Sequence, residues 1–301
     1  MTRKAAKTGP GAMVLVAIEQ GFPEAQRITT DPLAYPILPL SSRFWVRVSL
    51  TVRDWIVAKT EQNAPGLWGS MMARKRYIDD VVTEAVGGSV EAVVNLGAGF
   101  DTRAFRLTEL ATVPVWEVDQ PENTDIKQRR LRAIFDEVSD HVTLVPINFD
   151  KEGLATVLAA HGYAGSDTAL FIWEGVTQYL TEPGIRATME FLATAPAGSR
   201  LVFTYTPKDF IDGKVLYGHE NLYRRMRVKN TIWHTGFDPV ASDDFLGDYG
   251  WKVREHLGYD ELGERYVEPT GRNLGWMAIE RVVHAEKIDS SNTEKQVSKG
   301  R

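Results

Sequence analysis

The sequence predicts an α/β protein built on a mostly parallel sheet, and three observations carry this prediction. From Glu91 onward, short apolar runs alternate with amphipathic stretches, which is the pattern of repeated strand–helix–strand units. The residues before that point lack strand patterning and favour helices. The last two apolar runs, Trp251–Leu257 and Leu274–Val283, have no convincing helix between them, so we expect them to pair as an antiparallel hairpin.

The composition narrows the class of protein. Of the 301 residues, 43% are hydrophobic and 25% are charged, as in ordinary soluble globular chains of one or two domains. The formal net charge of -5 argues against binding that depends on neutralising nucleic-acid phosphates. The chain has no cysteine, which excludes disulfides and thiolate chemistry and fits a reducing compartment. No segment has the 18 or so apolar residues that a membrane span needs. We therefore expect a cytoplasmic protein without nucleic-acid or membrane partners.

The N-terminal third, residues 1–90, is predicted to be a helical cap. An amphipathic helix is expected near residues 12–19 rather than a signal peptide, because Glu19 directly follows the short apolar run and no small-residue cleavage site is present. Apolar residues at helical spacing predict one helix over Ser42–Gln62. They predict a second helix over Leu67–Val86, which Gly87 and Gly88 end.

The elements after Glu91 follow from the alternating pattern. The earlier candidate strands are Ala92–Leu96, Val113–Val118, Val142–Pro146, Thr168–Trp173 and Arg200–Tyr205. The candidate helices between them are Thr102–Leu110, Glu122–Glu137, Lys151–His161 and Glu182–Thr194. The aromatic and charged stretch 206–250 is too long for an ordinary connection, so it is interpreted as a lid inserted between the fifth and sixth strands. The predicted division is a cap (1–90), a sheet domain (91–286) that contains the lid, and a polar tail (287–301).

A glycine turn follows the first predicted strand. Gly97, Ala98 and Gly99 lead into a helix for which Asp101 is the expected N-cap. Glycines allow a ligand to approach the backbone, and a helix N-terminus offers free N–H donors. The third glycine of a dinucleotide fingerprint is replaced by Thr102, which weakens a dinucleotide interpretation. A plain structural turn explains the motif equally well.

Two carboxylates stand at the ends of predicted strands. Asp119 ends the second strand about 20 residues after the glycines, where an acidic side chain accepts hydrogen bonds from ribose hydroxyls. The alternative role for Asp119 is to cap the helix that begins at Gln120–Glu122. Glu174 follows the fourth strand and faces the same crevice, where a cationic partner would offset its burial. For Glu174 the alternative is a structural ion pair with Arg74 or Arg103.

These motifs together resemble a known family. Leu96–Arg103, Glu117–Asp119 and Glu174–Leu180 are similar to the leucine carboxyl methyltransferase superfamily, and in particular to its bacterial S-adenosylmethionine-dependent O-methyltransferases, which include polyketide carboxyl methyltransferases. The stretches Asp31–Ala34 and Ala73–Asp79 also resemble the N-terminal pattern of that family. The resemblance implies the class I methyltransferase (Rossmann-like) fold, with a sheet of seven strands of which the last is antiparallel, and S-adenosyl-L-methionine as the cofactor.

The resemblance also implies roles for individual residues. Arg74 matches the arginine that pairs with the cofactor's carboxylate, and Gly97, Ala98 and Gly99 match the turn along its methionine part. Asp119 matches the ribose ligand, and Glu174 matches the acidic residue near the cofactor's amino group. Asn148 and Phe149 stand where the family has an Asp-Leu pair facing adenine, and an Asn carbonyl oxygen still accepts from the adenine amino group.

The catalytic residues are less defined by the sequence. His219 and His234 in the expected lid are candidates because histidine is the commonest general base, and Tyr205 ends the fifth strand. Arg103, near a helix N-terminus, is expected to pair with Glu117 or Asp101. No metal-ligand spacing stands out, so no metal is predicted.

The sequence therefore favours methyl transfer to a small-molecule oxygen, preferably a carboxylate, in secondary metabolism. A carboxylate acceptor needs no base, whereas a phenol does. The alternatives are a phenol or carbon methyltransferase, an NAD-dependent oxidoreductase on the same kind of sheet, and a cofactor-binding sensor without catalysis. The identity of the acceptor and the oligomeric state are left open.

Overall fold

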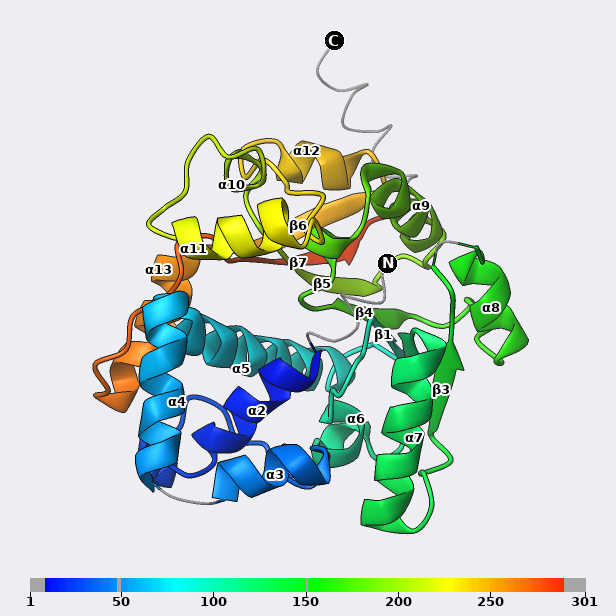
Figure 1. Ribbon diagram of the computed structural model, residues 1–301. Helices are drawn as coiled ribbons and strands as arrows, with labels where there is room; N and C mark the ends of the chain where they lie inside the picture. Colours follow the sequence, from blue (N-terminus) through cyan, green and yellow to red (C-terminus); the bar gives the residue numbers. More distant parts are fainter. Residues whose placement is uncertain (1–8, 48–49, 150, 290–301) are drawn as a thin grey trace.

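One seven-stranded sheet in the order β3-β2-β1-β4-β5-β7-β6 forms the centre of the molecule (Figure 1). The structure is a computed structural model that describes residues 9–47, 50–149 and 151–289. The strands are β1 (Ala92–Leu96), β2 (Val115–Asp119), β3 (Val142–Pro146), β4 (Ala169–Trp173), β5 (Arg200–Tyr205), β6 (Trp251–Leu257) and β7 (Arg281–Lys287). The first five pair in parallel, and β7 pairs antiparallel with both β5 and β6. The predicted fold class is confirmed.

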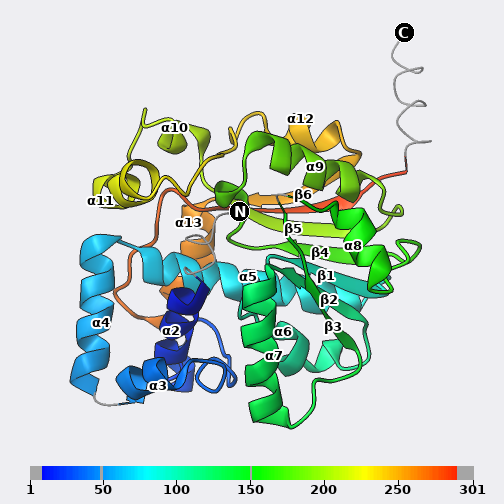
Figure 2. The same cartoon turned by 45° about the vertical axis from the view of Figure 1, so that its right-hand side comes forward.

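Helices cover both faces of the sheet (Figures 1 and 2). One face carries α5 (Leu67–Val86), α6 (Arg103–Arg106) and α7 (Pro121–Phe135). The other carries α8 (Leu154–Ala160), α9 (Glu182–Ala193) and α12 (Ser242–Gly247). Alternate residues of each strand enter the two clusters, as Val93 and Val94 do on opposite sides of β1. Because both of their faces are buried, β1 and β4 read as nearly continuous apolar runs in the sequence.

The N-terminal helices differ from the prediction in two respects. The helix α2 (Gly9–Glu19) contains the expected segment 12–19, but it is not amphipathic, because Leu15, Val16, Ala17 and Ile18 are all buried. The single helix expected over Ser42–Gln62 is instead two helices, α3 (Leu40–Arg47) and α4 (Leu50–Asn63). The two helices run in different directions in Figure 1, and both contribute residues that pack on the core.

The remaining helices before the lid also shift at their ends. The helix predicted over Thr102–Leu110 is divided into α6 and a 3-10 turn, η2 (Thr108–Leu110), and the cap position is Thr102 rather than Asp101. The Asp101 carboxylate nevertheless accepts from the Arg103 N–H at 2.8 Å. The helix α8 starts at Leu154 instead of at Lys151.

The last strand begins later than its apolar run. The strand expected over Leu274–Val283 is β7, and it starts at Arg281. Residues 274–280, here called the strap, cross α5 instead, with the Met277 N–H donating to Ser70 Oγ at 2.6 Å. The strap fits closely because Gly69 faces it without a side chain. Short helices, α13 (Tyr259–Leu262), η5 (Gly263–Val267) and η6 (Glu268–Thr270), lie between the last two strands, where none was expected. Lys287, expected to open the tail, belongs to β7, and residues 290–301 lie outside the described part of the chain.

The segment 206–250 forms two different structures. Its first part contains α10 (Lys208–Ile211), α11 (Glu220–Tyr223) and the π-helix η4 (Arg224–Lys229). Phe210, Leu222 and Trp233 of this part pack with Met277 of the strap in a third apolar cluster above the sheet's carboxyl edge. Its last part contains α12, which packs on β6 and covers one face of the sheet. The name lid is therefore kept here for residues 206–241.

Candidate active site

A cavity of about 850 Å³ lies at the carboxyl ends of the parallel strands. This volume is within the usual range for small-molecule sites and leaves room for two ligands side by side. The lid helices α11 and η4 lie over one side of it, across from α4 (Figures 1 and 2). Its lining comes from distant segments, among them α2 (Met13), α4 (Lys59), α5 (Arg74), the β1 turn (Gly97 to Gly99), the β4 loop (Glu174), the lid (Arg225) and the strap (Met277).

The glycine turn after β1 is shaped for close approach. Gly97 and Gly99 have φ angles of +76° and +50°, which favour glycine. A Cβ on Gly97 would lie 2.4 Å from a Val176 methyl group, so no larger residue fits there. A Cβ on Gly99 would instead project beside the Asp119 carboxylate, 3.9 Å away. The turn therefore leaves free space next to Asp119, on the lining of the cavity.

Asp119 ties the turn to the start of α7. Its Oδ2 accepts from the Gly99 N–H at 2.6 Å, and its Oδ1 accepts from the Gln120 N–H at 2.6 Å and from Asn123 Nδ2 at 2.8 Å. Burial raises the pKa of Asp119, and these donors oppose that effect. The alternative capping role is not present, because Gln120 is the N-cap of α7 and Asp119 accepts from no backbone N–H of the helix. A carboxylate of this geometry still has acceptor capacity toward the cavity.

Glu174 is held by three cations. Its Oε1 lies 3.0 Å from Arg74 Nε and 3.4 Å from Lys75 Nζ, and its Oε2 lies 2.7 Å from Arg103 Nη1. Burial alone would raise the pKa of Glu174, but the three cations outweigh it and keep the pKa well below its usual range. Glu174 is therefore ionised, and the ion pairs considered from the sequence, to Arg74 and to Arg103, are both present.

Arg103 is the centre of this buried network. Besides Glu174 it pairs with Asp101 at 2.5 Å and with Asp79 at 2.6 Å. The expected pairing with Asp101 is confirmed, whereas the pairing with Glu117 is wrong. Glu117 pairs instead with Lys127 at 2.5 Å, and both side chains are buried between β2 and α7. Burial raises the pKa of Glu117 to about 7, although the Lys127 ammonium opposes the rise.

Arg74 reaches the cavity from α5. Its Nε donates to Glu174, and its Nη1 lies 2.5 Å from Glu280 Oε1. Among the described residues, none accepts from Nη2. Gly175 adopts φ +67°, and a Cβ there would lie 3.3 Å from Nη2. One donor edge of Arg74 is therefore exposed to the cavity.

Several predicted site residues do not join the cavity. Asn148 and Phe149 are absent from its described lining, and Phe149 packs on the second face of the sheet. His219 and His234 are absent from it as well. Burial lowers the pKa of both histidines, and the charge of Arg227 adds to the effect at His234. Tyr205 does line the cavity, but its hydroxyl is within 2.7 Å of His256 Nε2.

Sequence reasoning missed much of the lining, including Lys75, Thr204, Glu280 and Arg225. Lys75 stands in the quoted stretch Ala73–Asp79, but nothing marked it beside Arg74. Thr204 fixes the β4 loop by accepting from the Gly175 N–H at 2.7 Å. Glu280 lies in the segment Leu274–Val283, which was expected to be a strand. Arg225 lies in the lid, where no sequence pattern predicts which side chains face the cavity. Within the described ranges no group of three or more potential ligands could hold a metal ion, and no helix is long and apolar enough to cross a membrane.

The strand order and the glycine turn at the cavity define a class I methyltransferase fold. A putative methyltransferase from Thermobifida fusca shares this fold with a TM-score of 0.57 at 13% identity, covering 80% of this chain and 90% of that one. A DUF574 family protein from Streptomyces avermitilis has a TM-score of 0.56 at 11% identity and covers 90% of this chain and 99% of that one.

Sequence comparison then identifies the family. The model of the leucine carboxyl methyltransferase family matches residues 11–193, and the chain belongs to this family. A protein of Mycolicibacterium smegmatis, named as a putative S-adenosyl-L-methionine-dependent methyltransferase, is 32% identical over 250 residues, or 80% of both chains. A Bacillus subtilis protein with the same kind of name, YktD, is 26% identical over 220 residues, or 72% of both. The protein is an S-adenosylmethionine-dependent methyltransferase.

The residues at the cavity fit this cofactor. The free space beside Asp119 suits a polar group that donates to a carboxylate, and the open edge of Arg74 suits a carboxylate. When bound, S-adenosylmethionine supplies an electrophilic methyl group on a sulfonium that leaves as a neutral thioether. The chain has to orient the acceptor and exclude water.

Proposed function

We propose that Arg74, Gly97, Ala98, Gly99 and Asp119 hold the cofactor. Arg74 pairs with its carboxylate, the glycine turn accommodates its methionine part, and Asp119 accepts from its ribose. The open Nη2 of Arg74 and the space beside Asp119 support these roles. Asn148 and Phe149 lie outside the cavity lining and are not part of the proposal.

We further propose that the methyl group goes to a carboxylate oxygen of a small organic acid. The observation that carries this proposal concerns histidine and carboxylate, the commonest general bases. The described lining contains no histidine, and each of its acidic side chains has a cation or a backbone N–H group as a partner. An acceptor that is already ionised at neutral pH needs no base, and a carboxylic acid meets this condition.

A cation on the acceptor side supports the same conclusion. Arg225 lines the cavity from η4, and among the described residues its guanidinium pairs with no carboxylate. Arginine matches the planar geometry of a carboxylate with two parallel N–H groups. Around it the lining is apolar, with Leu222, Met226 and Ile232 nearby in the lid. The acceptor is therefore an acid with an apolar body.

In the proposed reaction an oxygen–carbon bond forms and the carbon–sulfur bond of the cofactor breaks. The products are a methyl ester and S-adenosylhomocysteine, and no proton is transferred. Arg225 positions the carboxylate, and the lid keeps water from the reacting atoms. Phenol methylation would need a base, but neither candidate histidine belongs to the lining.

The test compares matched acceptors. Hydrophobic carboxylic acids and phenols of the same size are incubated with the enzyme and methyl-labelled cofactor, and the products are analysed by mass spectrometry. We expect methyl esters of the acids and no ethers of the phenols. Arg225→Gln should raise the KM for the acid by about tenfold, the loss of one charged hydrogen-bonding partner. The neighbouring Arg224, which does not line the cavity, provides the control Arg224→Gln. Methylation of the phenols alone would refute the proposal.

A further inference from the structure

The two buried glutamates beside Arg74, Glu174 and Glu280, differ in how many of their carboxylate oxygens already have a partner. Both oxygens of Glu174 already face cations, two at Oε1 and one at Oε2. Glu280 also lines the cavity and is only 8% exposed. Its Oε1 pairs with Arg74, but Oε2 has no hydrogen-bond partner among the described residues. Glu280 Oε2 is not among the fully buried oxygens without a partner in the described residues, so it is open to the cavity and Glu280 is a candidate for binding a ligand cation.

The open atoms of Glu280 and Arg74 belong to one ion pair. Glu280 Oε1 lies 2.5 Å from Arg74 Nη1, which leaves Glu280 Oε2 as an acceptor and Arg74 Nη2 as a donor. Gly175 has no side chain to cover Nη2. In the head group of an α-amino acid, a carboxylate and an ammonium are attached to the same carbon. Arg74 and Glu280 therefore match the carboxylate and the ammonium of such a head group in charge.

We infer that Glu280 is a further cofactor-binding residue, whose carboxylate pairs with the amino group of S-adenosylmethionine. In this arrangement Arg74 takes the carboxylate of the same head group. Glu174 then acts through Arg74 and Arg103, as the carboxylate that holds these two cations in place.

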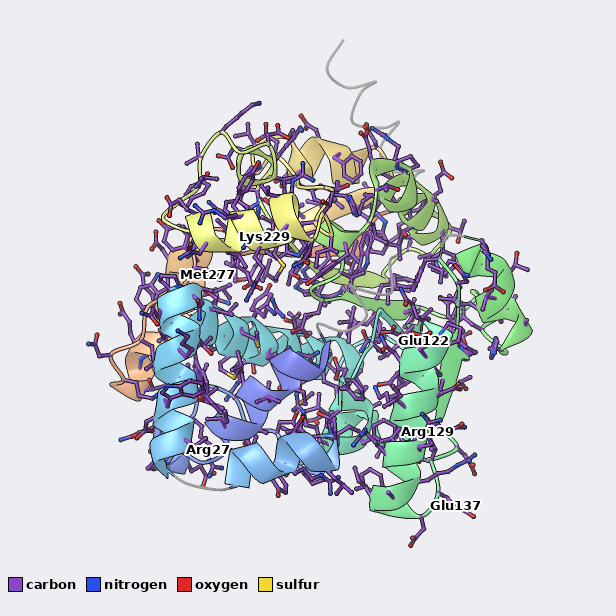
Figure 3. The ribbon with its side chains drawn as sticks, viewed as in Figure 1. Arg27, Glu122, Arg129, Glu137, Lys229 and Met277 are labelled. Carbon is purple, nitrogen blue, oxygen red and sulfur yellow. The ribbon has the colours of Figure 1, made fainter. Side chains whose placement is uncertain are left out.

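The strap keeps Glu280 fixed before the ligand arrives. Its Met277 N–H donates to Ser70 Oγ on α5, and the side chains of Met277 and Ile279 are 2% and 3% exposed. Both pack in the apolar cluster beneath the lid, and Figure 3 places Met277 just below the helix that carries Lys229. A carboxylate held in this way loses little freedom on binding, so its interaction with a cation is favoured.

The experiment measures binding and not turnover. Isothermal titration of the full chain compares S-adenosylhomocysteine with an analogue that lacks only the amino group. Glu280→Gln should weaken binding of S-adenosylhomocysteine by about tenfold or more and leave binding of the analogue within about twofold of wild type. Glu255→Gln is the matched control, because Glu255 pairs with Arg265 at 3.0 Å outside the cavity lining. It should change neither affinity.

Two results would overturn the inference. An equal loss for both ligands would mean that Glu280 acts only by holding Arg74. A loss specific to the amino group in Glu174→Gln, but not in Glu280→Gln, would assign the interaction to Glu174. If Glu280→Gln does not fold, Glu280→Asp keeps the charge but withdraws it by one methylene group. It should then show the same loss, for the ligand with the amino group only.

Discussion

Asp119 makes hydrogen bonds within the protein and also faces the cavity in which we propose that the cofactor binds. It accepts from the N–H groups of Gly99 and Gln120 and from the Asn123 side chain, and it also lines the cavity. From the sequence, capping and ribose binding were alternative roles for this residue. The structure does not show the capping role, because Gln120 is the N-cap of α7, whereas the free space beside Gly99 supports ribose binding. The hydrogen bonds that Asp119 already accepts are compatible with ribose binding because a carboxylate accepts more than one hydrogen bond at each oxygen.

The structural hydrogen bonds of Asp119 and its proposed role in ribose binding predict two separate losses. Asp119→Ala should lower the stability of the protein without ligand by about 1 kcal/mol or more, because the N–H groups of Gly99 and Gln120 lose their acceptor. It should also weaken S-adenosylhomocysteine binding by about tenfold, because a charged acceptor is lost. Thr124→Val provides the control, since Thr124 Oγ1 bonds to the Gln120 carbonyl at 3.1 Å at the same helix start but lies outside the cavity lining. Melting and titration are measured on both variants. Intact affinity in Asp119→Ala would leave Asp119 with its structural hydrogen bonds to Gly99, Gln120 and Asn123 alone.

Residue types at the site could be predicted from the sequence better than their partners. Strand ends indicated Asp119 and Glu174, because the carboxyl ends of parallel strands share one edge. The partner of Arg103 could not be fixed in the same way. Glu117 does not pair with Arg103 because it pairs with Lys127 of α7. No local sequence pattern defines how α7 is rotated about its axis, so the sequence could not place Lys127 beside Glu117.

At the scale of elements, the parallel strands were predicted well and the C-terminal strand was not. The strands β1, β3, β5 and β6 have their predicted ends, because polar and turn-forming residues bound their apolar runs in the sequence. The strand predicted over Leu274–Val283 begins too early, because Met277 and Ile279 are buried in the lid cluster and not in a sheet. An apolar run shows that a segment is buried but not which surface buries it.

The turn after β1 gives a prediction about one element. Gly97→Ala introduces a Cβ that meets Val176 at 2.4 Å, in addition to the strain of a positive φ. Gly162 has a φ of +85° and nothing within 4 Å of its Cβ position, so Gly162→Ala measures the backbone strain alone. We expect Gly162→Ala to lower the free energy of unfolding by about 1 kcal/mol. Gly97→Ala should lower it further and abolish measurable binding of S-adenosylhomocysteine. Equal urea midpoints with retained binding would show that the turn tolerates a side chain.

At the scale of the whole molecule, the site depends on segments that are distant in the sequence. Glu19 of α2 pairs with Arg272 at 2.7 Å, which connects the N-terminal helices to the segment before the strap. The strap then connects α5 to the lid cluster and carries Glu280 to Arg74. Such contacts arise from packing, so the sequence predicted a lid and a cap but not which of their residues meet. The division into a cap (1–90) and a methyltransferase domain remains a prediction, and α5 of the proposed cap packs directly on the sheet.

The central claim is that the acceptor arrives already ionised and that the chain supplies no base. The most direct test is the pH dependence of kcat at saturating cofactor and carboxylic acid, from about pH 5.5 to pH 9, above the usual pKa of a carboxyl group. Burial lowers the pKa of His219 and His234 below the ordinary histidine value, so protonation of either one would affect kcat only toward the acid end of the range. The account predicts a kcat that stays constant within about twofold across the range. A kcat that falls tenfold per pH unit toward acid would reveal an essential base and contradict it.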